Sequence, residues 1–486
     1  MNKFFASLFI LLSISFATKA QKIMLDGLMS DWAKITEKVT DSSNDCNLID
    51  FKEMAVSNDA DWLYIKLRVA KPMLLAENNN IFLEIDVDNN ATTGYKINGI
   101  GAEFGWNFGG RFGYYNKNKN ASIISHNDLS MSFLPSHEAM EFEIMLRRNA
   151  NPDGISELFV RDTIKILFWD KTTNGDLLPD KGKVFQYVFS KHSNDTFSRL
   201  DIGHDTKKSI RVMTWNVFVD GLTDTLRQSY FKRVLQAISP EIITFNEFWK
   251  SDTGQVIRIL NEFLPLKNTR GWTAIKNTEG NITCSAFPVK NAWIISEGHR
   301  MSAVLISVHK YGFNEMLVIN CHLRCCEADD ERLKEAYAAD AFLADALTPG
   351  GVIDLSPNTP FYLSGDMNLV GSYKPMDVLL GKGVNSARGN DWDGSALLQL
   401  IPSHTEHATA TTWRDIRKPF SPSRLDYFLY SGYTLNPVKS FILATEEMPA
   451  ETLTRYGLTP EDTKLASDHL PVVVDFTPKF IDPSSK

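Results

Sequence analysis

The sequence of 486 residues has few cysteines and no long cluster of basic residues. Its five cysteines are an odd number, so at least one stays unpaired if the protein is exported, and the chain is not a disulfide scaffold. Acidic residues outnumber basic ones by 59 to 51, which gives a formal net charge of −8. Proteins that grip long duplex nucleic acid usually present a basic face, so this balance argues against a high-affinity DNA binder without excluding a nuclease.

Long apolar runs are also lacking, except for one stretch at the N-terminus. Lys3 precedes an apolar segment at 4–16, and small residues follow at Thr18 and Ala20. The segment is too short to span a bilayer comfortably, and no cysteine follows it to carry a lipid. We therefore predict a signal peptide at 1–20, cleaved near Ala20, and a secreted or periplasmic protein without a membrane span. An N-terminal membrane anchor is the alternative.

Three cysteines, Cys321, Cys325 and Cys326, flank His322 and raise the question of a zinc site. Zinc sites usually have paired, well-spaced ligands on turns. Adjacent residues of a strand point to opposite faces, so Cys321 and His322 would diverge. We favour a buried Cys321 and at most one local disulfide over a zinc site.

Length and composition predict two or three globular domains, with 43% hydrophobic and 23% charged residues. Residues 21–190 contain short runs rich in aromatic and β-branched residues, separated by Asn, Gly and Asp, which predicts an antiparallel β-sandwich. Residues 191–208 are polar and aperiodic, and we interpret them as a linker. We expect modest contacts across it, so that a fragment beginning near Thr206 would fold and stay active.

Residues 209–478 alternate apolar strands with helical stretches, such as 226–238 and 328–347. This pattern predicts an α/β four-layer sandwich, in which two packed sheets are flanked by helices.

The N-terminal part offers two candidate binding features. In the segment 85–95, Asp86, Asp88 and Asn90 alternate in a way that could present oxygen atoms to Ca²⁺, although the same residues are also favourable in a turn. Three aromatic residues could form a platform on which a sugar stacks, although aromatic residues in strands more often lie in the core. These are Trp62, Trp106 and Tyr95.

Three segments of this part carry a resemblance to family-9 carbohydrate-binding modules. They are the opening DGLMSDW at 26–32, the strand LYIKLRV at 63–69 and the turn IDVDNNATTGY at 85–95. The resemblance implies a possible contact with a glycan or a cell surface.

In the C-terminal part, strand after strand ends in a carboxylate, imidazole or carboxamide. The fragments are MTWNVF with Asn216, ITFNEFW with Glu247, VINCHL with His322, YLSGDMNL with Asp366 and Asn368, SRLDYFLY with Asp426, and SDHLPVVVDF with Asp468 and His469. A carboxylate at the end of a buried strand costs free energy unless it is paired or bound to metal. Convergence of these groups at a sheet edge predicts a hard-metal site beside a base, suited to hydrolysis of a phosphate ester.

In this order, the six fragments resemble the endonuclease/exonuclease/phosphatase superfamily over roughly 208–477. The resemblance implies Mg²⁺ or Mn²⁺ as the cofactor, held by Glu247, Asp366, Asp468 and Asn216. It implies that His469 acts as general base on water and that Asp426 fixes its tautomer. His322, Asn368 and Asn216 would contact the phosphate, and His322 could instead assist the leaving oxygen. Asp366 could bind metal or position the water, and on an extended strand end it would face the same side as Asn368.

Together these features predict a secreted, Mg²⁺-dependent phosphoric ester hydrolase, acting as a monomer on a phosphodiester or phosphomonoester. Alternatives are an extracellular nuclease, a sphingomyelinase-like phospholipase, and a non-catalytic glycan- or surface-binding protein. The absence of a Tyr-x-Pro-Asn-like motif disfavours an abasic-site endonuclease.

Overall fold

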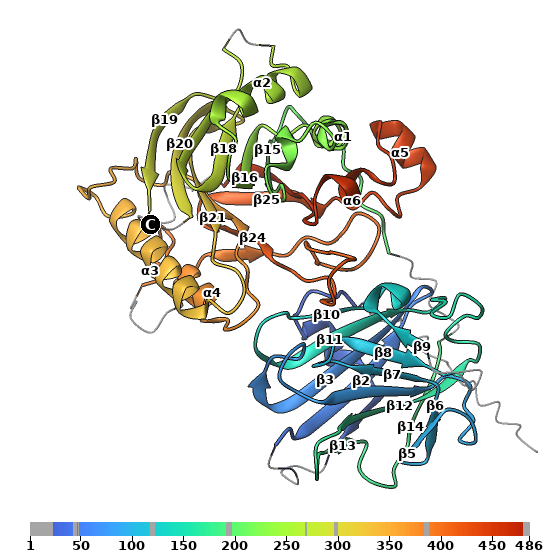
Figure 1. Ribbon diagram of the computed structural model, residues 1–486. Helices are drawn as coiled ribbons and strands as arrows, with labels where there is room; N and C mark the ends of the chain where they lie inside the picture. Colours follow the sequence, from blue (N-terminus) through green and yellow to red (C-terminus); the bar gives the residue numbers. More distant parts are fainter. Residues whose placement is uncertain are drawn as a thin grey trace, which may run out of the picture.

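The computed structural model describes residues 23–479, apart from 42–45, 47, 117–121, 191–196, 268–269, 296–299 and 383–387. The predicted signal peptide at 1–20 lies outside the described residues, as does the first third of the predicted linker. Figure 1 shows an all-β body, coloured blue to teal, beside a larger body coloured green to red.

The blue body consists of two antiparallel sheets, which confirms the predicted β-sandwich. The first sheet contains, in spatial order, β1 (Lys38–Thr40), β2 (Phe51–Asn58), β3 (Trp62–Met73), β11 (Ala139–Arg147) and β10 (Ser132–Leu134). The second contains β13 (Leu177–Leu178), β12 (Thr163–Asp170), β4 (Ile81–Asp86), β7 (Phe104–Asn107), β8 (Phe112–Tyr115) and β9 (Ser122–Ile124), with β14 (Phe185–Val188) also on β12. Smaller elements are the hairpin β5 (Tyr95–Ile97) and β6 (Ile100–Ala102), and the 3₁₀ helices η1 (Ser30–Lys34) and η2 (His126–Leu129).

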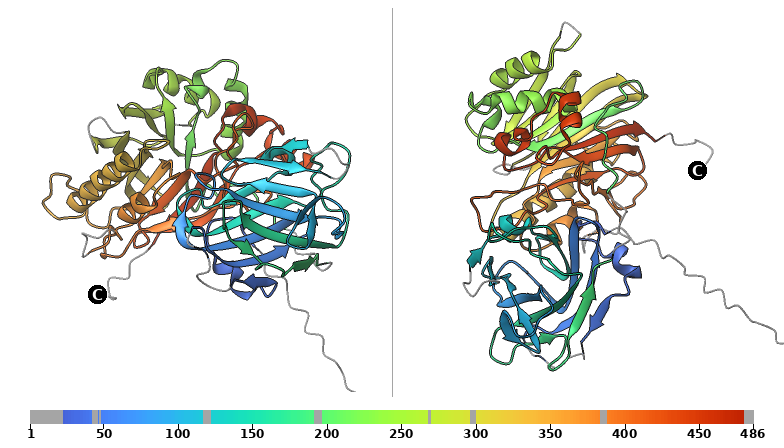
Figure 2. Two further views of the ribbon diagram at one scale, coloured as in Figure 1. Left: turned by 60° about the horizontal axis from the view of Figure 1, so that its bottom comes forward. Right: turned by 90° about the vertical axis from the view of Figure 1, so that its right-hand side faces the viewer.

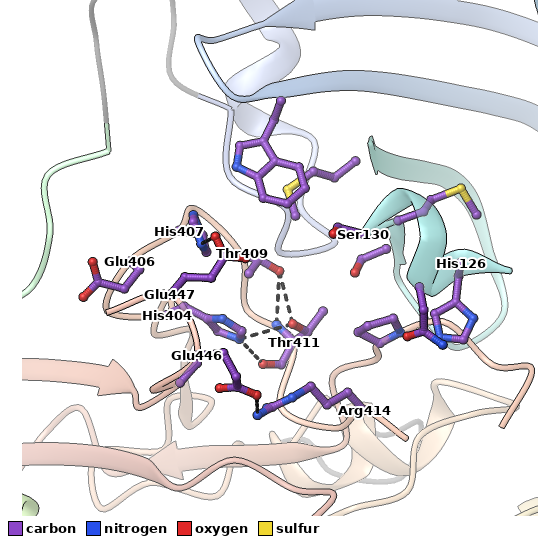
Figure 3. Close-up of a pocket in the computed structure, with 17 residues that line it drawn as sticks. His126, Ser130, His404, Glu406, His407, Thr409, Thr411, Arg414, Glu446 and Glu447 are labelled. Atoms are coloured by element: carbon purple, nitrogen blue, oxygen red, sulfur yellow. Dashed lines mark hydrogen bonds and ion pairs between the residues drawn. The ribbon is translucent and has the colours of Figure 1, made fainter. Parts of the chain in front are cut away.

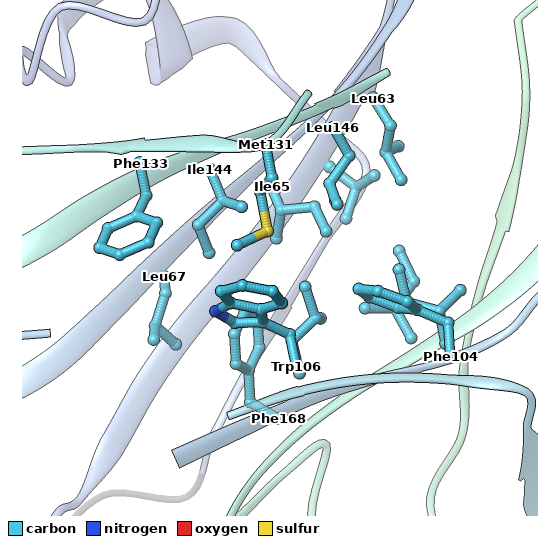
Figure 4. Packing of buried hydrophobic residues seen from close by; sticks show 14 of the residues in the cluster. Leu63, Ile65, Leu67, Phe104, Trp106, Met131, Phe133, Ile144, Leu146 and Phe168 are labelled. Atoms are coloured by element: carbon cyan, nitrogen blue, oxygen red, sulfur yellow. The ribbon is translucent and has the colours of Figure 1, made fainter. Parts of the chain in front are cut away.

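Two of the three aromatic residues considered for a sugar platform are buried in the sandwich. Trp106 is only 1% exposed and packs between the sheets against Phe168 and Met131 (Figure 4). Trp62 is 5% exposed. A platform of all three side chains is therefore wrong, because burial in the close-packed interior removes two of them from any ligand.

The larger body contains two six-stranded sheets. One runs β17 (Thr273–Thr278), β18 (Gly280–Ser285), β16 (Ile242–Phe248), β15 (Ile210–Asn216), β26 (Val472–Pro478), β25 (Leu435–Ile442). The other runs β19 (Val289–Ile294), β20 (Met301–Lys310), β21 (Phe313–His322), β22 (Phe361–Asp366), β24 (Asp426–Tyr430), β23 (Leu398–Leu400). The pairs β15–β16 and β21–β22 are parallel, and the other pairs in these sheets are antiparallel.

Helices cover the outer faces of both sheets, which confirms the four-layer arrangement (Figures 1 and 2). The first sheet is covered by α1 (Gln228–Ile238), α2 (Thr253–Phe263), α5 (Ala450–Tyr456) and α6 (Asp462–Ala466), with the short η3 (Gly221–Thr223). The second is covered by α3 (Asp329–Ala346) and α4 (Lys374–Leu379). A third apolar cluster, including Val212, Val318 and Tyr362, fills the space between the sheets. Among the described residues, no helix combines the length and apolar character needed to cross a membrane.

The described part of the predicted linker, 197–208, contains neither helix nor strand and lies against the larger body. Ile202 is buried in the core under α1, and Leu200 N–H donates to Thr405 O at 3.0 Å. The domain boundaries at 21–190 and 209–478 stay a prediction.

An ion pair joins the two bodies. Arg147, at the end of β11, donates from Nη1 to both carboxylate oxygens of Glu447, at 2.7 and 2.6 Å. His407 Nε2 lies 2.9 Å from the same carboxylate. Burial raises the pKa of Glu447, but His407 and Arg147 outweigh that effect and lower the pKa to about 2.

This depressed pKa predicts a pH-dependent contribution to stability. The contribution is present above the ordinary pKa of 4.5 and is lost as the pH falls toward about 2. We expect Glu447→Gln to be less stable than the wild type near neutral pH, by about 1 kcal/mol or less because the pair is partly exposed. Thermal unfolding should show this difference shrinking as the pH falls below 4.5. A stability difference that stays constant with pH would mean that the charge of Glu447 does not contribute to stability.

Candidate active site

Strand alternation brings four predicted site residues to one end of the space between the sheets. In each of their strands, a side chain two or four positions away packs between the sheets, so the polar residue points the same way. Register places His322 opposite Asp366, and Asp366 opposite Asp426, on neighbouring strands. The fourth residue is Asn216, at the end of β15 in the facing sheet; its Nδ2 donates to Asp366 Oδ2 at 3.0 Å.

Glu247 reaches the site through an irregularity in β16. Strict alternation would direct it toward the helices together with Phe245, which packs in the core under α1 and α2. The register with β18 shifts between Phe245 and Phe248, and Glu247 has a positive φ of 69°. Its Oε1 accepts from Asn216 Nδ2 at 3.1 Å, and its Oε2 accepts from Val219 N–H at 2.8 Å. A bulge at this point re-aims the carboxylate into the site.

Asp468 and His469 lie between α6 and β26. Ser467 fixes their backbone, because its Oγ donates to Asn216 O at 2.8 Å and accepts from His469 N–H at 3.1 Å. The indole of Trp413 donates to Asp468 Oδ2 at 3.2 Å.

His469 and Asp426 form a buried pair. His469 Nδ1 lies 2.8 Å from Asp426 Oδ2, and its Nε2 lies 3.7 Å from Asp366 Oδ2. Burial disfavours the imidazolium, but Asp426, Asp366 and Asp468 outweigh burial and raise the pKa of His469 to about 10. Asp426 thus orients the imidazole through Nδ1, while Nε2 faces Asp366, which is the arrangement that a general base requires.

His322 is 2% exposed and lies beside a cation that we did not predict. Arg300 Nη1 lies 3.2 Å from its Nδ1 and 3.1 Å from its Nε2. Burial first, then Arg300 and His469, hold the pKa of His322 well below its usual value. The imidazole is therefore neutral near pH 7 and can donate one hydrogen bond to a phosphate oxygen.

Asn368 does not have the extended geometry expected from its spacing to Asp366. Strand β22 ends at Asp366, and Asn368 adopts a left-handed conformation with φ of 47°. Its N–H donates to Asp366 Oδ1 at 3.0 Å, and its Nδ2 donates to Leu323 O at 3.0 Å. The Asp366 carboxylate thus accepts from the backbone of its own turn, and the sequence did not distinguish this turn from an extended strand end. Contact of Asn368 with phosphate stays a prediction.

The grouped carboxylates fit a hard divalent cation. Burial raises the pKa of Asp366 to about 7, and the nearby Asp426 and Glu247 add to this effect. Burial also raises the pKa of Asp468, with Glu247 contributing. Burial thus disfavours the charged forms of both carboxylates, which a cation would stabilise, and oxygen donors are the ligands that Mg²⁺ and Mn²⁺ prefer.

Asn216 holds these carboxylates together. Its Nδ2 donates to both Glu247 and Asp366, and its Oδ1 accepts from Phe218 N–H at 3.0 Å. Ligation of metal by its oxygen would require the opposite orientation of the amide.

Two tighter acidic clusters occur among the described residues of the sandwich. Asp86, Asp88 and Glu103 have ligand atoms within 4.8 Å of one another, as do Asp41, Asp50 and Asp176. The first contains two of the three residues considered for Ca²⁺; the third, Asn90, instead accepts from Thr92 at 3.0 and 2.7 Å.

All five cysteines are unpaired in the structure. Cys284 and Cys321 are buried, as expected for Cys321, while Cys325 and Cys326 are exposed. The local disulfide considered for them is not formed.

Several residues that shape the site were missed in the sequence. They contact the predicted residues and are Arg300, Thr412, Trp413, Asn246 and Trp249. Asn246 and Trp249 carried a signal, because both lie within two residues of Glu247 in the fragment ITFNEFW.

The chain belongs to the endonuclease/exonuclease/phosphatase family, whose family model matches residues 213–469, more than half of the chain. This confirms the resemblance seen in the six fragments. The likeness of the sandwich to family-9 carbohydrate-binding modules stays a prediction. A search of curated proteins returned no match.

Solved structures of low identity are similar to the C-terminal body. A member of the same family from Bacteroides thetaiotaomicron is 18% identical, with a TM-score of 0.37, over 55% of this chain and 97% of its own. A second from Bacteroides vulgatus is 14% identical, with a TM-score of 0.39, over 56% and 100%. A mannosyl-6-phosphatase from Bacteroides thetaiotaomicron is 18% identical, with a TM-score of 0.38, over 55% and 100%. Values this low carry no substrate over to this chain.

Proposed function

We propose that this family member is a secreted, metal-dependent phosphoesterase that hydrolyses a phosphodiester or phosphomonoester. The observation that carries the proposal is the His469–Asp426 pair, whose Nε2 faces Asp366 beside the Asn216–Glu247 contact. A base, its orienting carboxylate and an oxygen-rich metal site close together are what water attack on phosphorus requires.

In this mechanism the residues of the chain hold the phosphate and move one proton. His322 donates to a non-bridging oxygen, and Asn368 and Asn216 are the further candidates for that contact. A water molecule opposite the leaving oxygen gives one proton to His469 Nε2 as its oxygen bonds to phosphorus, and Asp426 stabilises the imidazolium. The bond between phosphorus and the leaving oxygen breaks, and the leaving oxygen takes a proton from solvent. Mg²⁺ or Mn²⁺, held by Glu247, Asp366 and Asp468, would neutralise charge developing on the phosphate.

The proton transfer requires a neutral His469 before each turnover. Asp366 and Asp468 are among the groups that raise its pKa. A cation held by these carboxylates would weaken their effect on the imidazole and would lower its pKa toward the range in which it can accept a proton.

A substrate panel tests the proposal. The full chain is incubated with plasmid DNA, RNA, sphingomyelin, and sugar and inositol phosphates, each with Mg²⁺, Mn²⁺ or EDTA. We expect metal-dependent hydrolysis of at least one class, which also decides among nuclease, phospholipase and phosphatase. A protein that binds glycans without hydrolysing any ester under these conditions would be the non-catalytic alternative.

Trp249 predicts a preference for substrates with a ring next to the phosphate. Its indole is 39% exposed, packs over Gly280 and lies 5.8 Å from the His322 ring. Gly280 is required there, because a Cβ would come within 2.8 Å of the indole. Stacking on an aromatic side chain contributes about 1–3 kcal/mol per base.

We therefore expect Trp249→Ala to raise KM roughly 5- to 100-fold for nucleoside or aryl esters and to leave alkyl phosphates almost unchanged. Trp249→Phe, which keeps a ring, is the matched control. Equal losses on both substrate types would mean that Trp249 serves the fold and not the substrate.

Two finer proposals concern the sandwich. Tyr95 is 44% exposed and stacks on Trp169 with ring centroids 6.3 Å apart, which supports a glycan contact at this pair. Asp86, Asp88 and Glu103 are the candidate ligands for Ca²⁺. Affinity electrophoresis with Trp169→Ala tests the glycan contact, and calorimetric titration of Ca²⁺ into Glu103→Gln tests the Ca²⁺ site.

Export is tested by N-terminal sequencing of protein from the culture medium, which should begin at Gln21.

A further inference from the structure

The sandwich contacts the segments that carry half of the candidate active site. The N-terminal segment ahead of η1 pairs with the larger body: Leu25 N–H donates to Ala408 O at 2.8 Å, and Leu25 O accepts from Ala410 N–H at 2.8 Å. Leu25 is fully buried. A strand-like pairing of this kind fixes the backbone at 408–410.

Two residues after Ala410, the chain contacts the backbone of Asp426 and the residue that follows His469. Thr412 Oγ1 accepts from Asp426 N–H at 2.9 Å, and Thr412 O accepts from Leu470 N–H at 2.7 Å. Arg414 N–H donates to Asp468 O at 2.8 Å. The segment 408–414 therefore lies between the sandwich and both Asp426 and the Asp468–His469 pair.

A second contact reaches the turn after Asp366. Ser136 Oγ donates to Leu369 O at 3.2 Å, and Glu138 N–H donates to Gly371 O at 2.8 Å. This turn begins with Asn368, whose N–H donates to Asp366.

A third contact is the Arg147–Glu447 ion pair. The neighbouring Glu446 pairs with Arg414 and accepts from Thr463 Oγ1 at 2.9 Å, in the helix that leads to Asp468. Glu446, Glu447 and Arg414 line a cavity of about 210 Å³ between the bodies, with His404 and Thr411 on its wall (Figure 3). Because this cavity interrupts the packing between the two bodies, the directional contacts contribute to their relative geometry.

None of the contacts just described falls on β15, β16 or β21, which carry Asn216, Glu247 and His322. The sandwich thus contacts the segments that carry the general base, whereas Asn216, Glu247 and His322 are positioned by strands of the larger body. We propose that the sandwich positions Asp426, Asp468, His469 and the turn after Asp366 for catalysis and is a structural part of the catalytic unit, with Leu25, Glu138 and Arg147 as positioning residues. The proposal rests on the hydrolase activity proposed above. It replaces our expectation that a fragment beginning near Thr206 stays active.

Point substitutions in the full chain test this proposal. Leu25→Pro removes the N–H that Ala408 O accepts, and Leu25→Val keeps it. Arg147→Ala removes the ion pair, and Arg147→Lys keeps a cation at this position. Arg148→Ala is the control, because the contacts of Arg148 with Asp59 O and Phe189 lie within the sandwich. We measure kcat per folded molecule, well below each variant's Tm, and amide exchange by mass spectrometry at 412–414, 425–426 and 468–470.

We expect kcat to fall at least about 10-fold in Leu25→Pro and several-fold in Arg147→Ala, because misplacement of a catalytic group by about 1 Å can cost 10²-fold. KM should change little, exchange should rise at the three segments, and Leu25→Val and Arg147→Lys should recover most of kcat. A lower Tm with unchanged kcat and unchanged exchange would overturn the proposal. If Leu25→Pro does not fold, Arg147→Ala decides. If the wild type hydrolyses no ester, the proposed function fails, and amide exchange alone decides whether the sandwich orders these segments.

Discussion

Replacing His469 by alanine is expected to lower kcat by about 10²–10⁴-fold, the usual effect of removing a general base. The imidazole is the one group that pairs with a buried carboxylate on one nitrogen and faces Asp366 with the other. Nothing else among the described residues combines these contacts. The fold should persist, because the backbone of His469 keeps its bonds to Ser467 Oγ and Trp215 Nε1.

Steady-state kinetics at saturating metal, with circular dichroism to confirm folding, measure this effect. His204→Ala is the control, since His204 lies in the linker segment and contacts Ser209 O. Near-normal kcat in His469→Ala would remove the general base from the mechanism, and an equal loss in His204→Ala would point to a general loss of structure.

Metal removal should have an effect of similar size. We expect EDTA to abolish turnover and Mg²⁺ or Mn²⁺ to restore it, because the candidate ligands Glu247, Asp366 and Asp468 are all oxygen donors. Glu247→Ala should lose activity at every metal concentration that can be tested. Glu262→Ala, which removes an exposed carboxylate from α2, is the matched control.

Zinc distinguishes the alternative metal chemistry. Restoration by stoichiometric zinc alone, blocked by substitution of Cys321 or Cys325, would contradict the assignment. The structure makes this outcome unexpected, because Cys321 is buried in the core under α3, on the opposite side of β21 from His322.

The sequence was sufficient to predict that most of the candidate residues converge, because strand periodicity is a local property. Asn216, His322 and Asp366 end their apolar strands and Asp426 begins its strand, each on the face that alternation directs between the sheets. The order of the fragments then implied the family. The four-layer fold followed from the same alternation of strands and helices.

Features that depend on tertiary contacts could not be read in this way. The bulge that re-aims Glu247 and the left-handed turn at Asn368 break the periodicity on which the prediction rests. Arg300 and Thr412 carry no local pattern, and reach the site only because distant segments meet there. Contacts between the sandwich and the larger body, such as that of Leu25 with Ala408, could not be predicted for the same reason.

The most direct test of the central claim is the turnover of bis(p-nitrophenyl) phosphate and p-nitrophenyl phosphate by EDTA-treated full-length protein, before and after addition of Mg²⁺ or Mn²⁺. The account predicts no release of nitrophenol before addition, release from at least one ester afterwards, and none from Glu247→Ala or His469→Ala under the same conditions. Release that persists in EDTA, or that both variants retain at the wild-type rate, would contradict it.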